Sequence, residues 1–185
     1  AGVAGTEAIK KALANNAYVK VIDLSPERLK ALKMELGDEN IDYIISSKEN
    51  ILDALSVSDL VIGSVYVIGK EAPKVITKDM LSVMKEGSVI VDISIDQGGC
   101  IETSRPTTHD KPIFVEDGVI HYCVTNMPGA VPLTATLALN EATLSYISKL
   151  ANIGSKEALY DNKYLASGLS LSDGKIIHPA LKDIL

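Results

Sequence analysis

The first 24 residues, AGVAGTEAIKKALANNAYVKVIDL, carry the strongest fold signal near the start of the sequence. Gly2 and Gly5 have the spacing of the second and third glycines of a G-x-G-x-x-G turn, and apolar residues follow at helical spacing. Residues 18–24 then have the pattern of a short strand that places Asp23 at its end, 18 residues after Gly5. An acidic residue about 20 residues beyond such a turn accepts hydrogen bonds from the ribose hydroxyls of NAD. The stretch therefore predicts a dinucleotide-binding turn, and the alternative for Asp23 is an ordinary carboxylate at a strand end.

Downstream of this stretch, strands and helices alternate. Ser25 and Pro26 have the pattern of a helix start, with a capping serine before a proline in the first turn. Strands are expected at 41–45, 59–64 (buried), 89–95 and 119–124, and helices at 25–37, 48–56 and 77–84, the last capped by Thr77. Such alternation favours βαβ units, and therefore an α/β domain with a Rossmann-type doubly wound parallel sheet. We expect this NAD-binding domain to cover residues 1–133 and a C-terminal helical part, with a long apolar helix at 134–152 and a polar tail, to cover 134–185.

The composition predicts a folded domain with an aliphatic core and excludes several functions. Apolar residues make up 46% and charged residues 23% of the chain, with one Phe and no Trp. The formal charge of −6 disfavours general nucleic-acid binding. The two cysteines lack metal-ligand spacing, which predicts reduced thiols in a cytoplasmic protein and no metal site. No apolar run approaches the roughly 20 residues that a membrane span needs, so no membrane partner is expected.

The glycine turn lacks part of its motif. The first glycine, and the strand that feeds the turn, would lie before Ala1. In a doubly wound fold that strand is central and buried on both faces. Loss of four buried aliphatic side chains at about 2 kcal/mol each would remove roughly 8 kcal/mol, which is comparable to the stability of a whole domain. We therefore expect a sheet lacking its first strand, and a chain that does not fold like the complete domain unless another segment supplies that strand.

Residues 91–112, VDISIDQGGCIETSRPTTHDKP, carry a second group of polar residues. Asp96 is expected at the carboxyl end of a strand, where open α/β sheets bind ligands. Gly98 and Gly99 would let the backbone approach a ligand closely. Asp96 is therefore the candidate for chemistry, with a turn-capping role as its alternative, whereas Asp92 is interpreted as an acceptor of backbone hydrogen bonds.

Residues 124–132, VTNMPGAVP, supply a third candidate. Asn126 offers a donor and an acceptor at the end of a strand, which suits the binding of a carboxamide, and its alternative is a turn asparagine. His109 and His121 are possible acid–base groups, but neither has a convincing partner nearby in the sequence. Both histidines are therefore expected to be structural.

Together, these segments resemble the alanine dehydrogenase family. The matching stretches are GVAGTEA, VIDLSPERL, SDLVIG, APKVIT, GSVIVDISIDQGGCIETSRPTTH and VTNMPGAVP, which cover nearly all of residues 1–160 in the family's order. The resemblance implies reversible conversion of L-alanine, NAD and water to pyruvate, ammonia and NADH. It also implies a cytoplasmic, commonly hexameric enzyme of amino-acid metabolism, in which the Rossmann-type domain is inserted in a catalytic domain.

The same resemblance implies which residues bind the cofactor. These are Gly2, Val3, Gly5, Asp23, Arg28, Ser46, Val65, Tyr66, Val75, Ile95, Asp96, Asn126 and Met127. Asp23 would bind the adenosine ribose with Arg28 alongside. The alternative for Arg28 is a solvated charge on a helix. If Arg28 contacted a 2′-phosphate, the preference for NAD over NADP would be weaker. Adenine would lie near Ser46, and the dinucleotide cleft would be lined by Val65, Tyr66 and Val75. The nicotinamide would be surrounded by Ile95, Asp96, Asn126 and Met127, with Asp96 as the catalytic carboxylate that helps proton transfer.

Two related families share this architecture: proton-pumping transhydrogenase, in its nicotinamide-binding part, and saccharopine dehydrogenase. Transhydrogenases typically have Glu in the DQGG-like segment, so Asp96 followed by Gln97 favours alanine dehydrogenase. The family's substrate-binding Arg and Lys and its catalytic His lie in an N-terminal portion that these residues do not include, and Leu133 stands where a basic residue is usual. We therefore expect the chain alone to be inactive and to need that segment. The remaining alternative is a non-catalytic nucleotide-binding or assembly module.

Overall fold

The computed structural model describes residues 1–67 and 71–181. The chain forms two compact units, the first made of residues 1–67 and 71–126 and the second beginning at Met127. The domain boundary that the sequence predicts after residue 133 lies a few residues further along the chain, and it stays a prediction. The last residues of the predicted C-terminal part, 182–185, lie outside the described residues.

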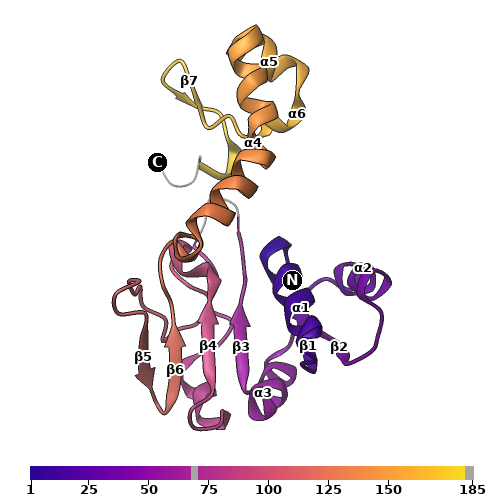
Figure 1. Cartoon of the computed structure of the whole chain (residues 1–185), viewed down its shortest axis with the longest axis vertical. Helices are drawn as coiled ribbons and strands as arrows, with labels where there is room; N and C mark the ends of the chain where they lie inside the picture. Colours follow the sequence, from indigo (N-terminus) through magenta and orange to yellow (C-terminus); the bar gives the residue numbers. More distant parts are fainter. Residues whose placement is uncertain (68–70, 182–185) are drawn as a thin grey trace. The chain divides into compact units, whose positions relative to one another are not determined.

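The first unit alternates helices and strands largely as the sequence predicts (Figure 1). Its helices are α1 (Val3–Ala14), α2 (Pro26–Leu36) and α3 (Lys48–Val57), with the 3₁₀ segments η1 (Lys78–Val83) and η2 (Ile93–Gln97). Its strands are β1 (Val19–Asp23), β2 (Ile41–Ile45), β3 (Leu60–Gly63), β4 (Val89–Asp92), β5 (Ile113–Glu116) and β6 (Val119–Tyr122). The sequence explains where α2 begins, because the Ser25 hydroxyl oxygen accepts a hydrogen bond from the Arg28 amide at 3.1 Å and Pro26 occupies the first turn.

The strands of the first unit form two sheets. β1 pairs in parallel with β2, and this register places Asp23 opposite Ile45. The second sheet has the order β3-β4-β6-β5, in which the first three strands are parallel and β5 is an antiparallel edge strand. Among the residues described, no ladder joins β1 to β3, and α1 contacts both of these strands. The prediction of a Rossmann-type doubly wound sheet lacking its first strand is therefore confirmed.

Aliphatic side chains fill both cores, as the composition predicts. The core beside β1 and β2 contains Ile9, Val21, Leu29, Leu32 and Ile41. The core beside the second sheet is larger and contains Leu55, Ala72, Ile76, Met80, Leu81, Met84, Ile90, Cys100, Ile101 and Val119. These residues come from α3, η1, β4 and β6 and from the connecting segments at 72–76, 84 and 100–101. The packing of α3, η1 and these connections buries one face of the second sheet.

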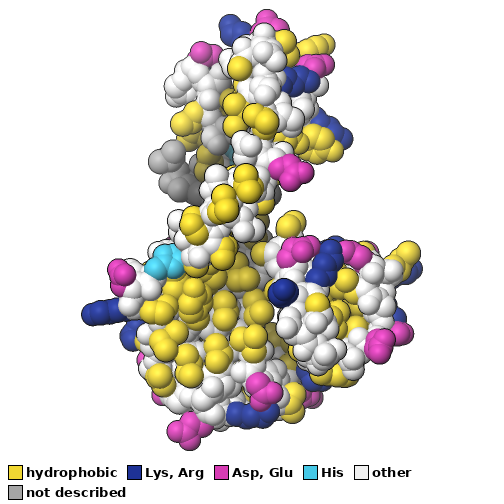
Figure 2. Space-filling view, viewed as in Figure 1, with side chains coloured by type: hydrophobic (Ala, Val, Ile, Leu, Met, Phe, Trp, Pro, Cys, Tyr) yellow, Lys and Arg dark blue, Asp and Glu magenta, His cyan; other side chains and the backbone are white. Residues whose placement is uncertain are grey.

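The opposite face of the second sheet is open. Leu60 pairs with Val89, Val89 with Ile120 and Ile120 with Val115, so these four side chains lie on the same face of the sheet. Ile62 also lies on this face, because it is two residues beyond Leu60 on the same strand. Leu60 is 54% exposed, Ile62 is 38% exposed and Val115 is 61% exposed. Figure 2 shows the resulting apolar surface over the sheet in yellow. The strand predicted at 59–64 is therefore confirmed, but the expectation that it is buried is wrong for Leu60 and Ile62, because they point to this solvent-accessible face.

Three local expectations change in the structure. The helix predicted at 77–84 is instead the 3₁₀ segment η1, which covers Lys78–Val83, and the Thr77 hydroxyl bonds the Asp79 carboxylate instead of capping the backbone. The strand expected at 89–95 ends at Asp92, because this side chain accepts the Ser94 amide at 3.0 Å and starts η2. β5 is an additional strand, joined to β6 by a tight turn in which Asp117 and Gly118 have φ of +49° and +79°.

The second unit begins with η3 (Met127–Ala130) and the long helix α4 (Pro132–Ile153), which confirms the helix predicted at 134–152. The predicted tail follows as α5 (Ser155–Asp161), α6 (Lys163–Ser167), a hairpin of β7 (Leu171–Ser172) and β8 (Lys175–Ile176), and η4 (Pro179–Leu181). No residue of α4 is buried, and Leu133, Leu137 and Leu144 are 73%, 60% and 51% exposed. In the part of the chain that the structure describes, every helix is too short or too polar to cross a membrane.

Candidate dinucleotide-binding site

The glycine turn leads directly into α1. Gly2 is the extended residue before the helix, and the first amide with a helical acceptor is that of Thr6, which donates to the Gly2 carbonyl at 2.9 Å. The backbone amides ahead of Thr6 thus lack helical acceptors, as at every helix start, and such an end attracts phosphate groups. Val3 is 86% exposed at this end. A Cβ added at Gly2 would meet nothing within 4 Å, so the turn is open on its outer side.

Gly5 has a different role, because it lets α1 approach the second sheet. It is buried, and a Cβ at this position would lie 3.4 Å from the Ser64 hydroxyl oxygen, just beyond the end of β3. Packing of a helix against the end of a strand is what the third glycine of a dinucleotide-binding turn permits. Gly5 therefore lies where α1 approaches the end of β3, and its part in cofactor binding stays a prediction.

Asp23 ends β1 beside the glycine turn. One carboxylate oxygen accepts the Ser25 amide at 2.9 Å, and the other pairs with the Ala1 ammonium. Burial alone would raise the pKa of Asp23, but the Ala1 ammonium, the Ser25 amide and the nearby Arg28 charge together lower it. The Ser46 amide donates to the Asp23 carbonyl at 2.9 Å, so the structure brings Asp23 and Ser46 together at the carboxyl ends of β1 and β2.

Arg28 braces the glycine turn. Its Nε donates to the Ala1 carbonyl at 2.8 Å, and its Nη2 donates to the Thr6 hydroxyl oxygen at 2.6 Å. The Thr6 hydroxyl in turn donates to the Gly2 carbonyl at 2.8 Å. The guanidinium is therefore bound to protein acceptors beside Asp23 rather than solvated as a free helix charge.

The segment after β3 is locked to η2 by reciprocal hydrogen bonds. The Val65 amide donates to the Ser94 hydroxyl oxygen at 2.8 Å, and the same hydroxyl donates to the Val65 carbonyl at 2.8 Å. Ser94 is buried, Val65 packs against the larger core and Tyr66 is 68% exposed. The Val75 amide donates to the Cys100 carbonyl at 2.8 Å. Two residues of the predicted cleft lining, Val65 and Val75, are therefore anchored to the segment that carries Asp96.

Asp92 is fully buried and organises this segment from within. Its carboxylate accepts the amides of Ser94, Cys100 and Ile101 at 3.0, 2.9 and 3.2 Å. The prediction that Asp92 accepts backbone hydrogen bonds is confirmed. Burial raises the pKa of the Cys100 thiol to about 12, and the adjacent Asp92 charge adds to this effect.

Asp96 lies on η2, which directly follows the carboxyl end of β4. Its side chain is exposed, whereas its neighbour Ile95 is 4% exposed and anchors the segment in the core. Gly98 ends η2 in the left-handed conformation, with φ of +84°. The structure therefore presents the Asp96 carboxylate to solvent from a well-anchored turn.

Asn126 follows β6, the strand that pairs in parallel with β4, so its turn and η2 lie at the same edge of the sheet. Asn126 is exposed and left-handed, with φ of +53°, and its carbonyl accepts a hydrogen bond from His109 Nε2 at 3.1 Å. Met127 is the next residue in the chain and begins the second unit. Asp96 and Asn126 are thus brought to one edge from segments 30 residues apart.

Both histidines contact structural partners, in agreement with the prediction. His121 is fully buried, with Nδ1 3.0 Å from the Val119 carbonyl and Nε2 2.8 Å from the Thr103 hydroxyl oxygen. Its ring stacks on Phe114 with 4.8 Å between centroids. His109 holds the Asn126 backbone. The described residues contain no group of three or more side chains that could hold a metal ion.

Sequence reasoning missed two residues that shape the site, Ser94 and Lys74. Ser94 bonds Val65 across 29 residues, and Lys74 donates to the carbonyls of Gly98 and Gly99 across 24 and 25 residues. Neither contact follows from a local motif. The only available signal was that Ser94 and Lys74 lie within the segments VDISIDQGG and APKVIT that carry the family resemblance.

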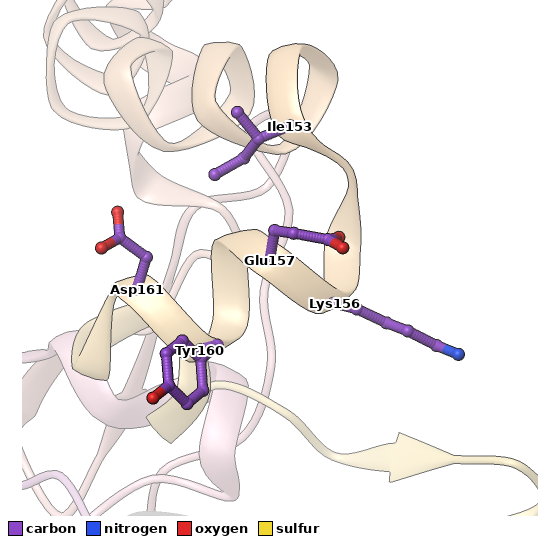
Figure 3. A pocket seen from close by; sticks show the side chains of 5 residues that line it. All are labelled: Ile153, Lys156, Glu157, Tyr160 and Asp161. Atoms are coloured by element: carbon purple, nitrogen blue, oxygen red, sulfur yellow. The ribbon is translucent and has the colours of Figure 1, made fainter.

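A separate open pocket lies on the second unit and is lined by Ile153, Lys156, Glu157, Tyr160 and Asp161 (Figure 3). The polar ends of these side chains point in different directions in the figure, and Tyr160 is 97% exposed. The pocket therefore has no converging set of groups, and it contains none of the predicted site residues.

The glycine turn with Asp23 and the open sheet edge with Asp96 and Asn126 define a Rossmann-type dinucleotide-binding domain. Comparison with known proteins gives the family: residues 1–179 match the model described as alanine dehydrogenase/PNT, C-terminal domain. The chain therefore belongs to this family.

Individual relatives support the same assignment. Curated proteins named alanine dehydrogenase from Halomonas elongata and Staphylococcus haemolyticus are 48% identical over 182 residues and 49% identical over 183 residues, each covering 98% of this chain. A solved structure of L-alanine dehydrogenase matches 99% of the chain with a TM-score of 0.86 and 44% identity. A transhydrogenase from Sinorhizobium meliloti matches 97% with a TM-score of 0.74 and 25% identity. The resemblance to alanine dehydrogenases is confirmed.

The match is confined to part of each relative. The chain spans 49% of the length of both curated alanine dehydrogenases and 50% and 48% of the two solved chains.

Proposed function

We propose that this chain is the NAD-binding part of an alanine dehydrogenase that converts L-alanine, NAD and water to pyruvate, ammonia and NADH. The observation that carries the proposal is the place of Asp23, whose carboxylate lies beside the glycine turn at the carboxyl end of β1. This is where an NAD-binding domain holds the adenosine ribose.

The residues fit NAD at both ends of the site. The open turn at Gly2 and the first amides of α1 suit the pyrophosphate, and the lowered pKa of Asp23 keeps its carboxylate ionised to accept ribose hydroxyls. The same negative charge would repel a 2′-phosphate, which favours NAD over NADP. Arg28 would act indirectly, by holding the turn.

At the other end, the proposed surroundings of the nicotinamide are Ile95, Asp96, Asn126 and Met127, with the cleft between lined by Val65, Tyr66 and Val75. NAD, when bound, accepts the hydride that leaves the α-carbon of alanine. The exposed Asp96 carboxylate is the proposed catalytic group, because it can accept or return a proton near that carbon. Asn126 offers its amide to the carboxamide of the nicotinamide.

Fluorescence titration with NADH tests the binding proposal on the chain itself. We expect saturable binding, weaker binding of NADPH, and an affinity for NADH about tenfold lower in Asp23→Asn, because a charge-assisted hydrogen bond is lost. Asp42→Asn is the control, since Asp42 is a carboxylate on β2 that bonds Tyr18, just before β1, and Lys20, on β1. Absence of a response at millimolar NADH would contradict the proposal.

The catalytic proposal needs the other half of the relatives. The chain is mixed with the N-terminal half of a curated alanine dehydrogenase, and alanine-dependent NADH formation is followed. We expect turnover in the mixture and none with Asp96→Asn, which should still bind NADH. A mixture that binds NADH and assembles without turnover would instead favour the non-catalytic module.

We also propose that the chain acts in a cytoplasmic homo-oligomer, a hexamer by family resemblance. The exposed leucines of α4 support an assembly surface, and the two buried cysteines, which form no disulfide, suit a reducing compartment. Sedimentation of the mixture with the N-terminal half measures the oligomer, and a monomer would contradict this proposal.

A further inference from the structure

Lys74, which lies outside the proposed cofactor-binding set, binds the turn that follows Asp96. Its ammonium donates to the backbone carbonyls of two successive residues, Gly98 and Gly99, the second at 2.7 Å. Each bond joins a cation to a backbone oxygen, and such charge-assisted bonds are stronger than those between neutral groups.

The turn that Lys74 binds is also held by hydrogen bonds from its own backbone amides. Gly98 and Gly99 are both left-handed, with φ of +84° and +73°. Their amides donate back into η2, from Gly98 to the Ile95 carbonyl at 3.1 Å and from Gly99 to the Ser94 carbonyl at 3.0 Å. The amides of Gly98 and Gly99 therefore close η2 while their carbonyls bind Lys74, so the amide and the carbonyl of both glycines have partners.

Lys74 is also held in place by its own neighbours in the chain. The Ala72 amide donates to the Gln97 carbonyl at 3.0 Å, and the Val75 amide donates to the Cys100 carbonyl at 2.8 Å. Lys74 lies between these two anchors, directly alongside the turn. Its backbone is thereby fixed, and only the side chain must be ordered to make both contacts.

We propose that Lys74 is a positioning residue for Asp96: its ammonium holds the turn at residues 97–99 and so orients η2 and the Asp96 carboxylate at the nicotinamide end of the site. This role rests on the proposed function, in which Asp96 faces the nicotinamide. It predicts a local effect. Removal of the ammonium weakens ligands that contain nicotinamide and spares ADP-ribose, because the adenosine side is held by Asp23.

The first test is amide hydrogen exchange without any ligand. Lys74→Met removes the ammonium and keeps an apolar stem, Lys74→Arg keeps the charge and donors, and Lys78→Met is the control, since Lys78 forms an exposed pair with Glu116 at 2.7 Å. We expect exchange at Gly98 and Gly99 to be about tenfold faster in Lys74→Met, near the original rate in Lys74→Arg, and unchanged in Lys78→Met. Unchanged exchange in Lys74→Met would overturn the proposal.

The second test compares NADH with ADP-ribose, which lacks the nicotinamide. We expect Lys74→Met to weaken NADH about fivefold with ADP-ribose unaffected, and Lys74→Arg to restore NADH affinity. Equal weakening of both ligands would indicate general structural damage and would overturn the positioning role. Failure of the unmodified chain to bind either ligand would contradict the proposed function, and the exchange measurement would still decide whether Lys74 holds the turn.

Discussion

Replacement of Gly99 by alanine should destabilise the first unit more than the same replacement at Gly87, although both backbones are left-handed. Their φ angles are +73° and +79°, so alanine pays a similar conformational cost of about 1–2 kcal/mol at each. A Cβ at Gly87 would meet no atom within 4 Å, and this cost is then the whole effect. At Gly99 the Cβ would lie 2.8 Å from Asp92 Oδ2 and 3.1 Å from Ser104 Cβ.

Asp92 cannot retreat from this added carbon without loss. It is fully buried, and its carboxylate holds the three amides that shape the turn. Overpacking of this kind adds about 1–3 kcal/mol, so we expect Gly99→Ala to cost roughly 2–5 kcal/mol against about 1–2 kcal/mol for Gly87→Ala. Urea unfolding followed by circular dichroism measures both variants. Equal losses would show that the close approach of Gly99 to Asp92 has no energetic weight.

Three further outcomes follow from the buried and charged groups. Asp92→Asn should lower the free energy of unfolding by about 2–3 kcal/mol, because a neutral amide cannot accept all three backbone N–H groups, and a loss well under 1 kcal/mol in urea unfolding would contradict this. The pKa of Asp23 is lowered from its ordinary 3.8, so its stabilising contribution is present above the unfolded-state pKa and is lost as pH falls through the lower folded-state value. The stability difference between the unmodified chain and Asp23→Asn should therefore shrink on acidification from neutral pH to about pH 3, and a difference independent of pH would be inconsistent with a lowered pKa of Asp23. Because burial raises the pKa of Cys100 to about 12 and also raises that of Cys123, neither thiol should react with a thiol reagent at neutral pH before the chain unfolds; prompt labelling of the native chain would argue against the buried environment.

Local signals predicted most of the elements, because short-range chemistry sets them. Ser25 and Pro26 start α2 as their pattern indicates, and the spacing of Gly2 and Gly5 locates α1. β5 was not predicted, although Asp117 followed by Gly118 is a typical hairpin turn and could have indicated a strand before it. The early end of β4 has no such signal, because it depends on the Asp92 side chain reaching amides beyond the strand.

The exposed strand positions show a different limit. Leu60 and Ile62 belong to an apolar run, and such runs usually mark a strand buried on both faces. Their exposure depends on which elements cover each face of the sheet, and that cannot be read from the run itself. The contacts of Arg28 could not be predicted from the sequence either. Its position in the sequence predicted that it lies near Asp23, but only the folded chain shows that its guanidinium binds the Ala1 carbonyl and Thr6.

From the sequence alone, the chain is recognisable as an α/β dinucleotide-binding domain of the alanine dehydrogenase type, with Asp23, Asp96 and Asn126 as its polar markers. Periodicity, turn chemistry and motif spacing act over a few residues or one βαβ unit, so they can be recognised in the sequence. The tertiary structure was needed to show that Asp92 is buried, that Asp96 is exposed, and that Lys74 and Ser94 hold the segments around Asp96 by hydrogen bonds. The bonds of Lys74 to Gly98 and Gly99 and of Ser94 to Val65 join residues 24 to 29 positions apart. Sequence spacing does not encode such contacts, because they exist only once separate strands have packed side by side.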